Sequence, residues 1–206
     1  MATLNIAADA PYWSRPVPLR PSFFRKCALA LSLLLLFPVH LSQAQELRPT
    51  EAQLEAAYLY NFGKFVTWPP DRTKASETFG ICILGKDPFG QVLDATVTGE
   101  SIGGRKIEVK RLANMAQAQA CNILFVSMSE EGRLGPILAA AEILRLLTVS
   151  DIKHFAERGG AIGLVRQQDK IRFEINRRAA DRCHLVFSSE LLKVASKLFP
   201  EGAPGS

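Results

Sequence analysis

The sequence predicts a single α/β domain, a sandwich in which helices flank a mixed β-sheet. Short apolar runs that are typical of buried strands alternate with segments of helical periodicity, and this alternation favours an α/β fold. Residues 45–206 are enough for one hydrophobic core of ordinary size. The strongest strand candidates are 79–84 and 121–126, two apolar runs that carry one cysteine each.

Residues 1–44 have the layout of a secretory signal peptide. Four basic residues and one acidic residue precede the apolar run 27–37, and small residues near Ala44 supply a cleavage site before Gln45. The run is shorter than the roughly 20 apolar residues that span a bilayer, and an uncleaved anchor is the alternative. Because no cysteine follows the run at the cleavage point, a lipid anchor is not predicted. We therefore expect 45–206 to fold outside the cytoplasm.

The charge balance of the exported part gives no sign of a nucleic-acid partner. The whole chain has a net charge of +5, with 25 Lys and Arg against 20 Asp and Glu. Four of those basic residues and one of the acids lie in 1–44, which leaves a net charge of +2 for 45–206. The remaining basic residues are dispersed, with no basic stripe and interleaved aromatics of the kind that binds nucleic acid.

The first predicted helix is the most aromatic stretch of the chain. Thr50 is expected to cap it, with Gln53 as the capping-box partner three residues later. Trp68 precedes two prolines, which disfavours a helical conformation there and ends the helix. One apolar stripe at helical spacing is expected to face the core, and it consists of Leu54, Tyr58, Phe62 and Phe65.

The later elements follow from periodicity and turn residues. Further strands are predicted at 105–112, 146–149, 161–166, 170–175 and 185–187, and a loop at 99–104. Further helices are predicted at 89–93, 134–143, 152–158, from Asn176 onward, and at 190–198, with a helical turn at 114–119. Gly159 and Gly160 are expected to end the helix over 152–158, and Gln167–Asp169 is the expected turn of a hairpin.

No pattern of residues predicts an enzyme, a metal site or a cofactor. Residues 45–206 contain only two histidines, His154 and His184, and a metal site usually needs three or four ligands. The string 80–87 resembles a phosphate-binding loop, but Asp87 stands where a hydroxyl is required. A hydrolase is the least supported of the functional classes.

Three cysteines remain after the leader, and their pairing is open on spacing alone. Cys82 and Cys121 each lie in a strand-like run, so a disulfide between neighbouring strands is compatible with export. Two buried thiols are the alternative. Cys183 is left without an evident partner.

A series of strings along the chain resembles the YfiR family, in order and spacing from about residue 52 to 195. The strings are AAYLYNFGKFVTWP, ICILGKDPFG, Gly104-Arg105, CNILFVS with Ser129-Glu130, LTVSD, GGAIGLV, IRFEIN and FSSELLKVA. The resemblance implies a periplasmic α/β protein that forms homodimers. It also implies that the protein binds and inhibits the periplasmic sensor portion of a YfiN-like inner-membrane diguanylate cyclase. This inhibition lowers cyclic di-GMP. A YfiB-like outer-membrane lipoprotein, or redox stress, would relieve the inhibition.

The same resemblance assigns Cys82 and Cys121 to the inter-strand disulfide of the family. Some relatives have a second, short-range cysteine pair, and the corresponding region here, about 150–165, contains no cysteine. Redox control that depends on that second pair is therefore in doubt for this chain.

Two further sets of residues are candidates for binding. Tyr60, Lys64 and Trp68 lie on the aromatic side of the first helix, where residue types that dominate interface energetics are dense, and we expect them to contribute to partner or dimer contacts. A place in the core is the alternative for Tyr60 and Trp68, and it is the favoured one for Trp68. The second functional class is a periplasmic small-molecule-binding module that relays a signal to a membrane kinase or cyclase. In such a module, Arg172 and His184 would line the ligand pocket.

Overall fold

The computed structural model describes residues 49–70 and 77–199 of the chain. The predicted signal peptide and its cleavage site lie outside the described residues. Within the described ranges, no helix combines the length and the apolar character that crossing a membrane requires.

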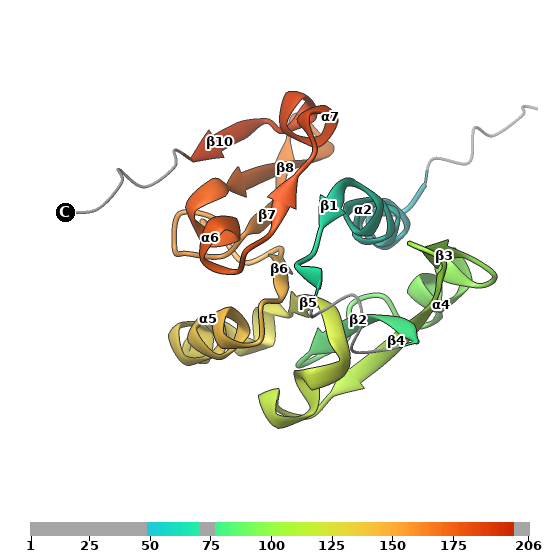
Figure 1. Ribbon diagram of the computed structural model, residues 1–206. Coiled ribbons are helices and arrows are strands. Elements are labelled where there is room, and N and C mark those ends of the chain that lie inside the picture. Colours follow the sequence, from blue (N-terminus) through green and yellow to red (C-terminus); the bar gives the residue numbers. More distant parts are fainter. Residues whose placement is uncertain (1–48, 71–76, 200–206) are drawn as a thin grey trace, which may run out of the picture. The chain divides into compact units, whose positions relative to one another are not determined.

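An eight-stranded mixed sheet forms the centre of the domain, as predicted (Figure 1). Its strand order is β10-β8-β7-β6-β5-β2-β4-β3. The pairs from β4 through β2, β5 and β6 to β7 are parallel, as is β10 with β8, whereas β3 with β4 and β7 with β8 are antiparallel. The strands are β2 (Thr78–Leu84), β3 (Ser101–Ile102), β4 (Arg105–Leu112), β5 (Cys121–Val126), β6 (Leu147–Ser150), β7 (Ile162–Gln167), β8 (Lys170–Asn176) and β10 (Lys197–Phe199).

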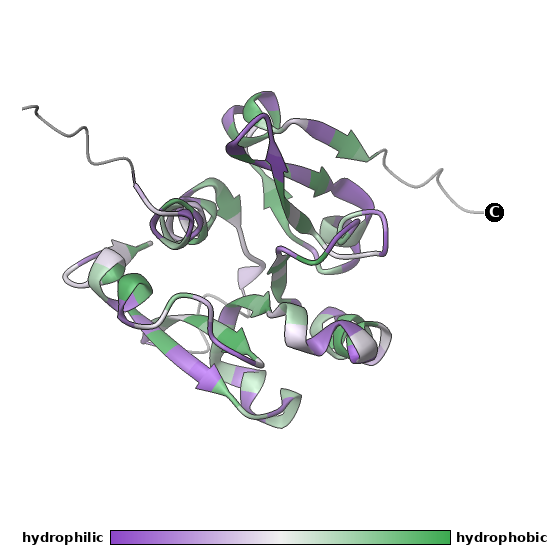
Figure 2. Cartoon of the chain, turned by 180° about the vertical axis from the view of Figure 1, so that it is seen from behind, coloured by the Kyte–Doolittle hydropathy of each residue, from purple (hydrophilic) through white to green (hydrophobic). Residues whose placement is uncertain are grey.

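The two central strands build a core on each face of this sheet. Successive side chains of a strand point to opposite faces. Phe79, Ile81 and Ile83 of β2 accordingly join one buried cluster, while Cys82 and Leu84 join the other. All six residues of β5 are buried, as expected of a parallel strand covered on both faces. The inner strands are correspondingly hydrophobic, whereas β4 carries several hydrophilic residues (Figure 2).

Helix α2 (Glu51–Phe65) covers the first of these faces, and its capping box is confirmed. The Thr50 amide donates to Gln53 Oε1 (2.7 Å), and the Gln53 amide donates to Thr50 Oγ1 (3.3 Å). The helix ends at Phe65 because the chain then enters β1 (Val66–Thr67), which pairs antiparallel with β9 (Val186–Phe187) in a separate two-stranded sheet.

The buried stripe of α2 differs from the prediction. Leu54 and Phe65 are 37% and 40% exposed, while the buried residues are Glu55, Ala56, Leu59, Phe62 and Gly63. The buried face is thus rotated about one residue from the predicted stripe. This orientation places Gly63 against Ile102, where a Cβ would lie 2.3 Å from Ile102 Cδ1, and leaves Leu54 and Phe65 at the edges of the buried face.

The other helices are short. They are α4 (Gln91–Val97), η2 (Met115–Ala120), η3 (Met128–Arg133), α5 (Leu134–Ile143), α6 (Arg177–Arg182) and α7 (Ser189–Val194). Helix α5 covers the second face of the sheet through Leu134, Ile137 and Ala141.

Three element predictions are wrong. Residues 152–158 form turns, in which His154 has a φ of +59°, a conformation that an α-helix does not contain. The last helix ends at Val194, because the next residues pair with β8 as β10, and both the amide and the hydroxyl of Ser196 donate to Phe173 O. The predicted loop over 99–104 contains β3, which forms a hairpin with β4 around two glycines of positive φ.

Candidate interaction surface and its disulfide

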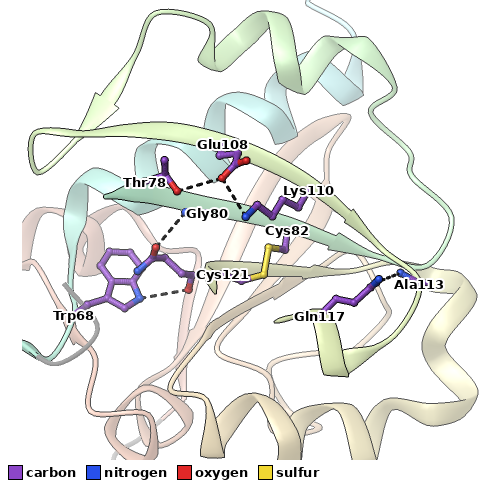
Figure 3. The surroundings of a disulfide bond; sticks show 10 residues. Trp68, Thr78, Gly80, Cys82, Glu108, Lys110, Ala113, Gln117 and Cys121 are labelled. Carbon is purple, nitrogen blue, oxygen red and sulfur yellow. Dashed lines mark hydrogen bonds and ion pairs between the residues drawn. A yellow bond between two sulfur atoms is a disulfide. The ribbon is translucent and has the colours of Figure 1, made fainter. Parts of the chain in front are cut away.

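A disulfide joins β2 and β5, two neighbouring inner strands of the sheet. Cys82 of β2 and Cys121 of β5 are both fully buried, with their Cα atoms 5.8 Å apart (Figure 3). The bond closes a sequence separation of 39 residues that includes α4, β3, β4 and η2. This cross-link therefore fixes β2 and β5 relative to each other and encloses the β3–β4 hairpin.

Local packing explains why the strands approach so closely beside the disulfide. The register of β2 on β5 shifts between Gly80 and Ile81. A Cβ at Gly80 would lie 2.3 Å from the carbonyl oxygen of Ala120, so only glycine fits at this point. The Gly80 amide donates to Asn122 Oδ1 (3.1 Å), which satisfies a buried backbone group at the irregularity.

Trp68 belongs to this buried region, which is the core position that the sequence offered as the alternative to a surface contact. It is 5% exposed, and its ring packs edge-on against Phe79 with the centroids 5.1 Å apart. Its indole Nε1–H donates to the carbonyl oxygen of Asn122 (3.3 Å; Figure 3). A hydrogen-bonded tryptophan in a closed core is a structural residue in the isolated chain.

Tyr60 and Lys64 lie together on the outward side of α2. The Tyr60 hydroxyl donates to Glu100 Oε2 (2.5 Å), and this hydrogen bond raises the pKa of the phenol. The ammonium of Lys64 lies 5.0 Å from the centre of the Tyr60 ring. These contacts tie the helix to Glu100, directly before the β3–β4 hairpin, so the two elements present one continuous surface.

A groove of about 420 Å³ opens between the carboxyl end of α2 and that hairpin. Its lining residues come from α2, β1, the segment after β1, and the hairpin, and they are Gly63, Lys64, Val66, Thr67, Trp68, Ser101, Ile102, Gly103 and Arg105. Gly63 is needed here, because a Cβ would lie 2.3 Å from Ile102 Cδ1. The groove is not predicted from the sequence, because residues 99–104 have the composition of a loop and their pairing as a hairpin is a tertiary feature.

A second pocket, of about 330 Å³, lies between α2, α7 and β8 and is mainly apolar. Its lining residues are Tyr58, Asn61, Phe62, Phe65, Phe173, Glu190, Leu191 and Val194. The rings of Tyr58, Phe62 and Phe173 contact one another, with centroids 5.1 to 5.8 Å apart. The exposed fractions of Phe65 (40%) and Val194 (63%) add apolar surface at the rim.

Arg172 and His184 do not come together at either pocket. Arg172 is exposed on β8 opposite Val165, and His184 is exposed after α6 with a φ of +54°. Neither residue lines the groove or the apolar pocket described above. A ligand pocket built on this pair remains a sequence-based prediction without a structural feature to support it.

Where α2 meets the end of β6, Glu55 is buried and Asp151 is half-buried. Glu55 is 6% exposed, and burial raises the pKa of its carboxyl to about 7, with the negative charges of Asp151 and Glu51 adding to the effect and Arg166 opposing it. Burial also raises the pKa of Asp151, whose buried Oδ1 has no hydrogen-bond partner among the described residues. Arg166 forms an ion pair with Glu51 above them.

Cys183 is a free, buried thiol. Burial raises its pKa to about 11, so the reactive thiolate is disfavoured. Within the two described ranges, no three or more His, Cys, Asp or Glu side chains are grouped to hold a metal ion.

The fold and the cross-link together define an α/β domain in which two neighbouring inner strands are joined by a disulfide and whose surface offers a groove and an apolar pocket. The chain belongs to the YfiR/HmsC-like family (DUF4154), whose family model matches residues 52–196. This family is a regulatory one.

Comparison with solved structures adds only distant similarity. A conserved domain protein from Vibrio cholerae O1 biovar El Tor strain N16961 aligns with a TM-score of 0.49 and 10% identity over 73% of this chain and 60% of its own. The ABC domain in complex with L-Trp from Streptococcus pneumonia aligns with a TM-score of 0.48 and 10% identity over 72% and 60%. The chain thus spans about 60% of each of these proteins, and TM-scores below 0.5 support no functional argument. None of the curated proteins matches this chain significantly.

Proposed function

We propose that this protein is a periplasmic regulator that binds the periplasmic sensor portion of an inner-membrane diguanylate cyclase and holds it inactive, which lowers cyclic di-GMP. The observation that carries the proposal is the match of the YfiR/HmsC-like family model to residues 52–196. The buried disulfide between Cys82 and Cys121 suits an oxidising compartment. In this proposal the protein acts as a homodimer, and a YfiB-like outer-membrane lipoprotein competes for it.

The inhibition follows from a difference in affinity. A domain without catalytic activity can shift a two-state receptor only by as much as its affinities for the two states differ. A rigid surface helps, because less conformational entropy is lost on binding. The cross-linked centre of the sheet and the contact of Tyr60 with Glu100 both restrict the surface formed by α2 and the hairpin.

The proposed contact residues are Tyr60 and Lys64. Their side chains lie together on the outward side of α2. Tyrosine is one of the types that contribute most when an interface buries them, and Lys64 supplies a charge beside it. Trp68 supports this surface from beneath and is not itself proposed as a contact, since it is 5% exposed.

The experiment measures cyclic di-GMP in the native bacterium after deletion of the gene and after its return. Deletion should raise cyclic di-GMP, and the wild-type gene should restore the lower level. The Tyr60→Ala/Lys64→Ala variant should restore it less well, whereas Lys153→Ala, a substitution at an exposed lysine outside this surface, should act as wild type. Unchanged cyclic di-GMP on deletion would contradict the proposal, and full restoration by the double variant would contradict the surface.

A second candidate function is the relay of a small-molecule signal to a membrane kinase or cyclase. The groove between α2 and the β3–β4 hairpin favours it, because its volume of about 420 Å³ falls in the range of small-molecule sites. A membrane cyclase encoded beside this gene would favour direct repression, and a hybrid kinase would favour the relay.

A further inference from the structure

The charges of the groove between α2 and the β3–β4 hairpin are unbalanced. Lys64 and Arg105 both line it, and neither has a carboxylate within 4.0 Å among the described residues. Five of the other described arginines form such ion pairs, namely Arg111, Arg133, Arg158, Arg166 and Arg182. Arg111, for example, pairs with both Asp87 and Asp94.

Of the two cations, Arg105 has the more unusual surroundings. Lys64 stands in the last turn of α2, where a cation is favoured by the helix dipole without any ligand. Arg105 is half-buried, with its Cζ 5.1 Å from the centre of the Phe79 ring. Its hydrogen bond from Nη1 to Thr78 O is long at 3.5 Å. Partial burial of a guanidinium without a counter-ion costs free energy, and burial accordingly lowers its pKa.

The rest of the lining is suited to a ligand with an apolar body. Val66, Trp68 and Ile102 are 6%, 5% and 7% exposed, so they form a firm apolar floor. Thr67 and Ser101 lie at the exposed rim. Glu100 stands next to Ser101, but its carboxylate accepts the Tyr60 hydroxyl and does not line the groove.

We propose that this groove binds a small organic anion, with its carboxylate or phosphate group on Arg105 and Lys64 and its apolar body over Trp68 and Ile102. The guanidinium offers several N–H donors in a plane, which matches the two oxygens of either head group. The bound anion would supply the negative charge that none of the described residues places beside Arg105 and Lys64. This inference does not depend on the proposed regulation of a cyclase, because it concerns binding to the purified protein alone.

The experiment is isothermal titration calorimetry of the purified, oxidised protein with phenyl phosphate and with phenylacetate. At least one anion should bind with a dissociation constant below about 1 mM, and the comparison shows which head group the groove prefers. Benzyl alcohol, which has a similar body without the charge, should give no binding at the same concentrations. Binding of benzyl alcohol as strong as that of the anions, or no anion binding up to about 10 mM, would overturn the proposal.

Variants locate the binding in the groove. Arg105→Gln should weaken it about tenfold or more, as expected when a charge-assisted hydrogen bond is lost. Arg172→Gln removes the same charge from an exposed position outside the groove and should leave binding unchanged. Equal binding by wild type and Arg105→Gln would refute the assignment. If circular dichroism shows that Arg105→Gln does not fold, Lys64→Gln, at an exposed position, decides in the same way.

A second readout reports the apolar half of the site. The chain has two tryptophans, Trp13 and Trp68. Trp13 lies in the predicted signal peptide, so in the purified mature protein, residues 45–206, the tryptophan fluorescence comes from Trp68 alone. It should change in a saturable manner with the same dissociation constant as the calorimetric titration. Saturable heat without any fluorescence change would place the anion elsewhere and contradict the proposal.

Discussion

The buried carboxyl of Glu55 makes the stability of the domain depend on pH in an unusual direction. Its pKa is about 7 in the folded protein, against an ordinary value of 4.5. As the pH rises above 4.5, the unfolded chain releases this proton before the folded chain does, so the folded state loses relative stability until the pH passes about 7. We therefore expect Glu55→Gln, which keeps the shape and removes the charge, to be more stable than wild type at pH 8.

The size of the effect follows from the pKa shift. At about 1.4 kcal/mol for each pKa unit, the shift from 4.5 to about 7 corresponds to an upper limit of about 3.5 kcal/mol. Because water partly reaches the Glu55 side-chain carboxyl, the destabilisation is smaller than this limit, and we expect about 2 kcal/mol. At pH 5 most of the penalty is absent, so the advantage of Glu55→Gln should fall below about 1 kcal/mol there.

Urea unfolding of the oxidised protein at pH 5 and pH 8 measures this difference. The free energy of unfolding of wild type is subtracted from that of the variant at each pH, which cancels the titration of the other groups. Glu77→Gln, at an exposed position just before β2, is the matched control and should show no pH-dependent difference. If the advantage of Glu55→Gln were the same at both pH values, the buried-carboxyl reasoning would be refuted.

Three further predictions concern the framework around the surface. Replacing both Cys82 and Cys121 by alanine should lower the free energy of unfolding by about 4 kcal/mol on the chain-entropy model, measured by urea unfolding; a loss no larger than that of a surface variant would contradict it. Gly80→Ala should destabilise by more than about 2 kcal/mol, because the added Cβ would lie 2.3 Å from a carbonyl oxygen, and a midpoint of thermal unfolding equal to wild type would disprove the close approach. Thr50→Ala should cost about 1 kcal/mol through the lost cap of α2, and the same assay with Thr50→Ser, which keeps a hydroxyl, should show most of it restored.

The features that depend on neighbouring residues could be predicted from the sequence. The strands over 79–84 and 121–126 were visible as apolar runs, and the capping box at Thr50 follows from two side chains three positions apart. The disulfide was open on spacing and was assigned through the family resemblance, and the structure confirms it.

The features that depend on tertiary contacts could not be predicted from the sequence. The rotation of α2 on the sheet is decided by packing, including the fit of Gly63 against Ile102, which no periodicity records. The strand β10 exists because β8 offers it a partner, although 190–198 has a helical pattern. The groove needs a two-residue strand, β3, beside the end of a distant helix, and the only sequence signal for it is the pair of glycines in the hairpin turn.

The covalent ring closed by Cys82 and Cys121 has a mechanical consequence. Glu100, Ser101 and Arg105 all lie on the stretch of chain between the two sulfur atoms. When the bond is intact, the two ends of this stretch are covalently joined to each other within the sheet. Reduction opens the ring, and β2 and β5 are then held together by the hydrogen bonds and packing of the sheet alone. A reductant would thus loosen the base of the hairpin by acting on only two sulfur atoms in the interior of the molecule.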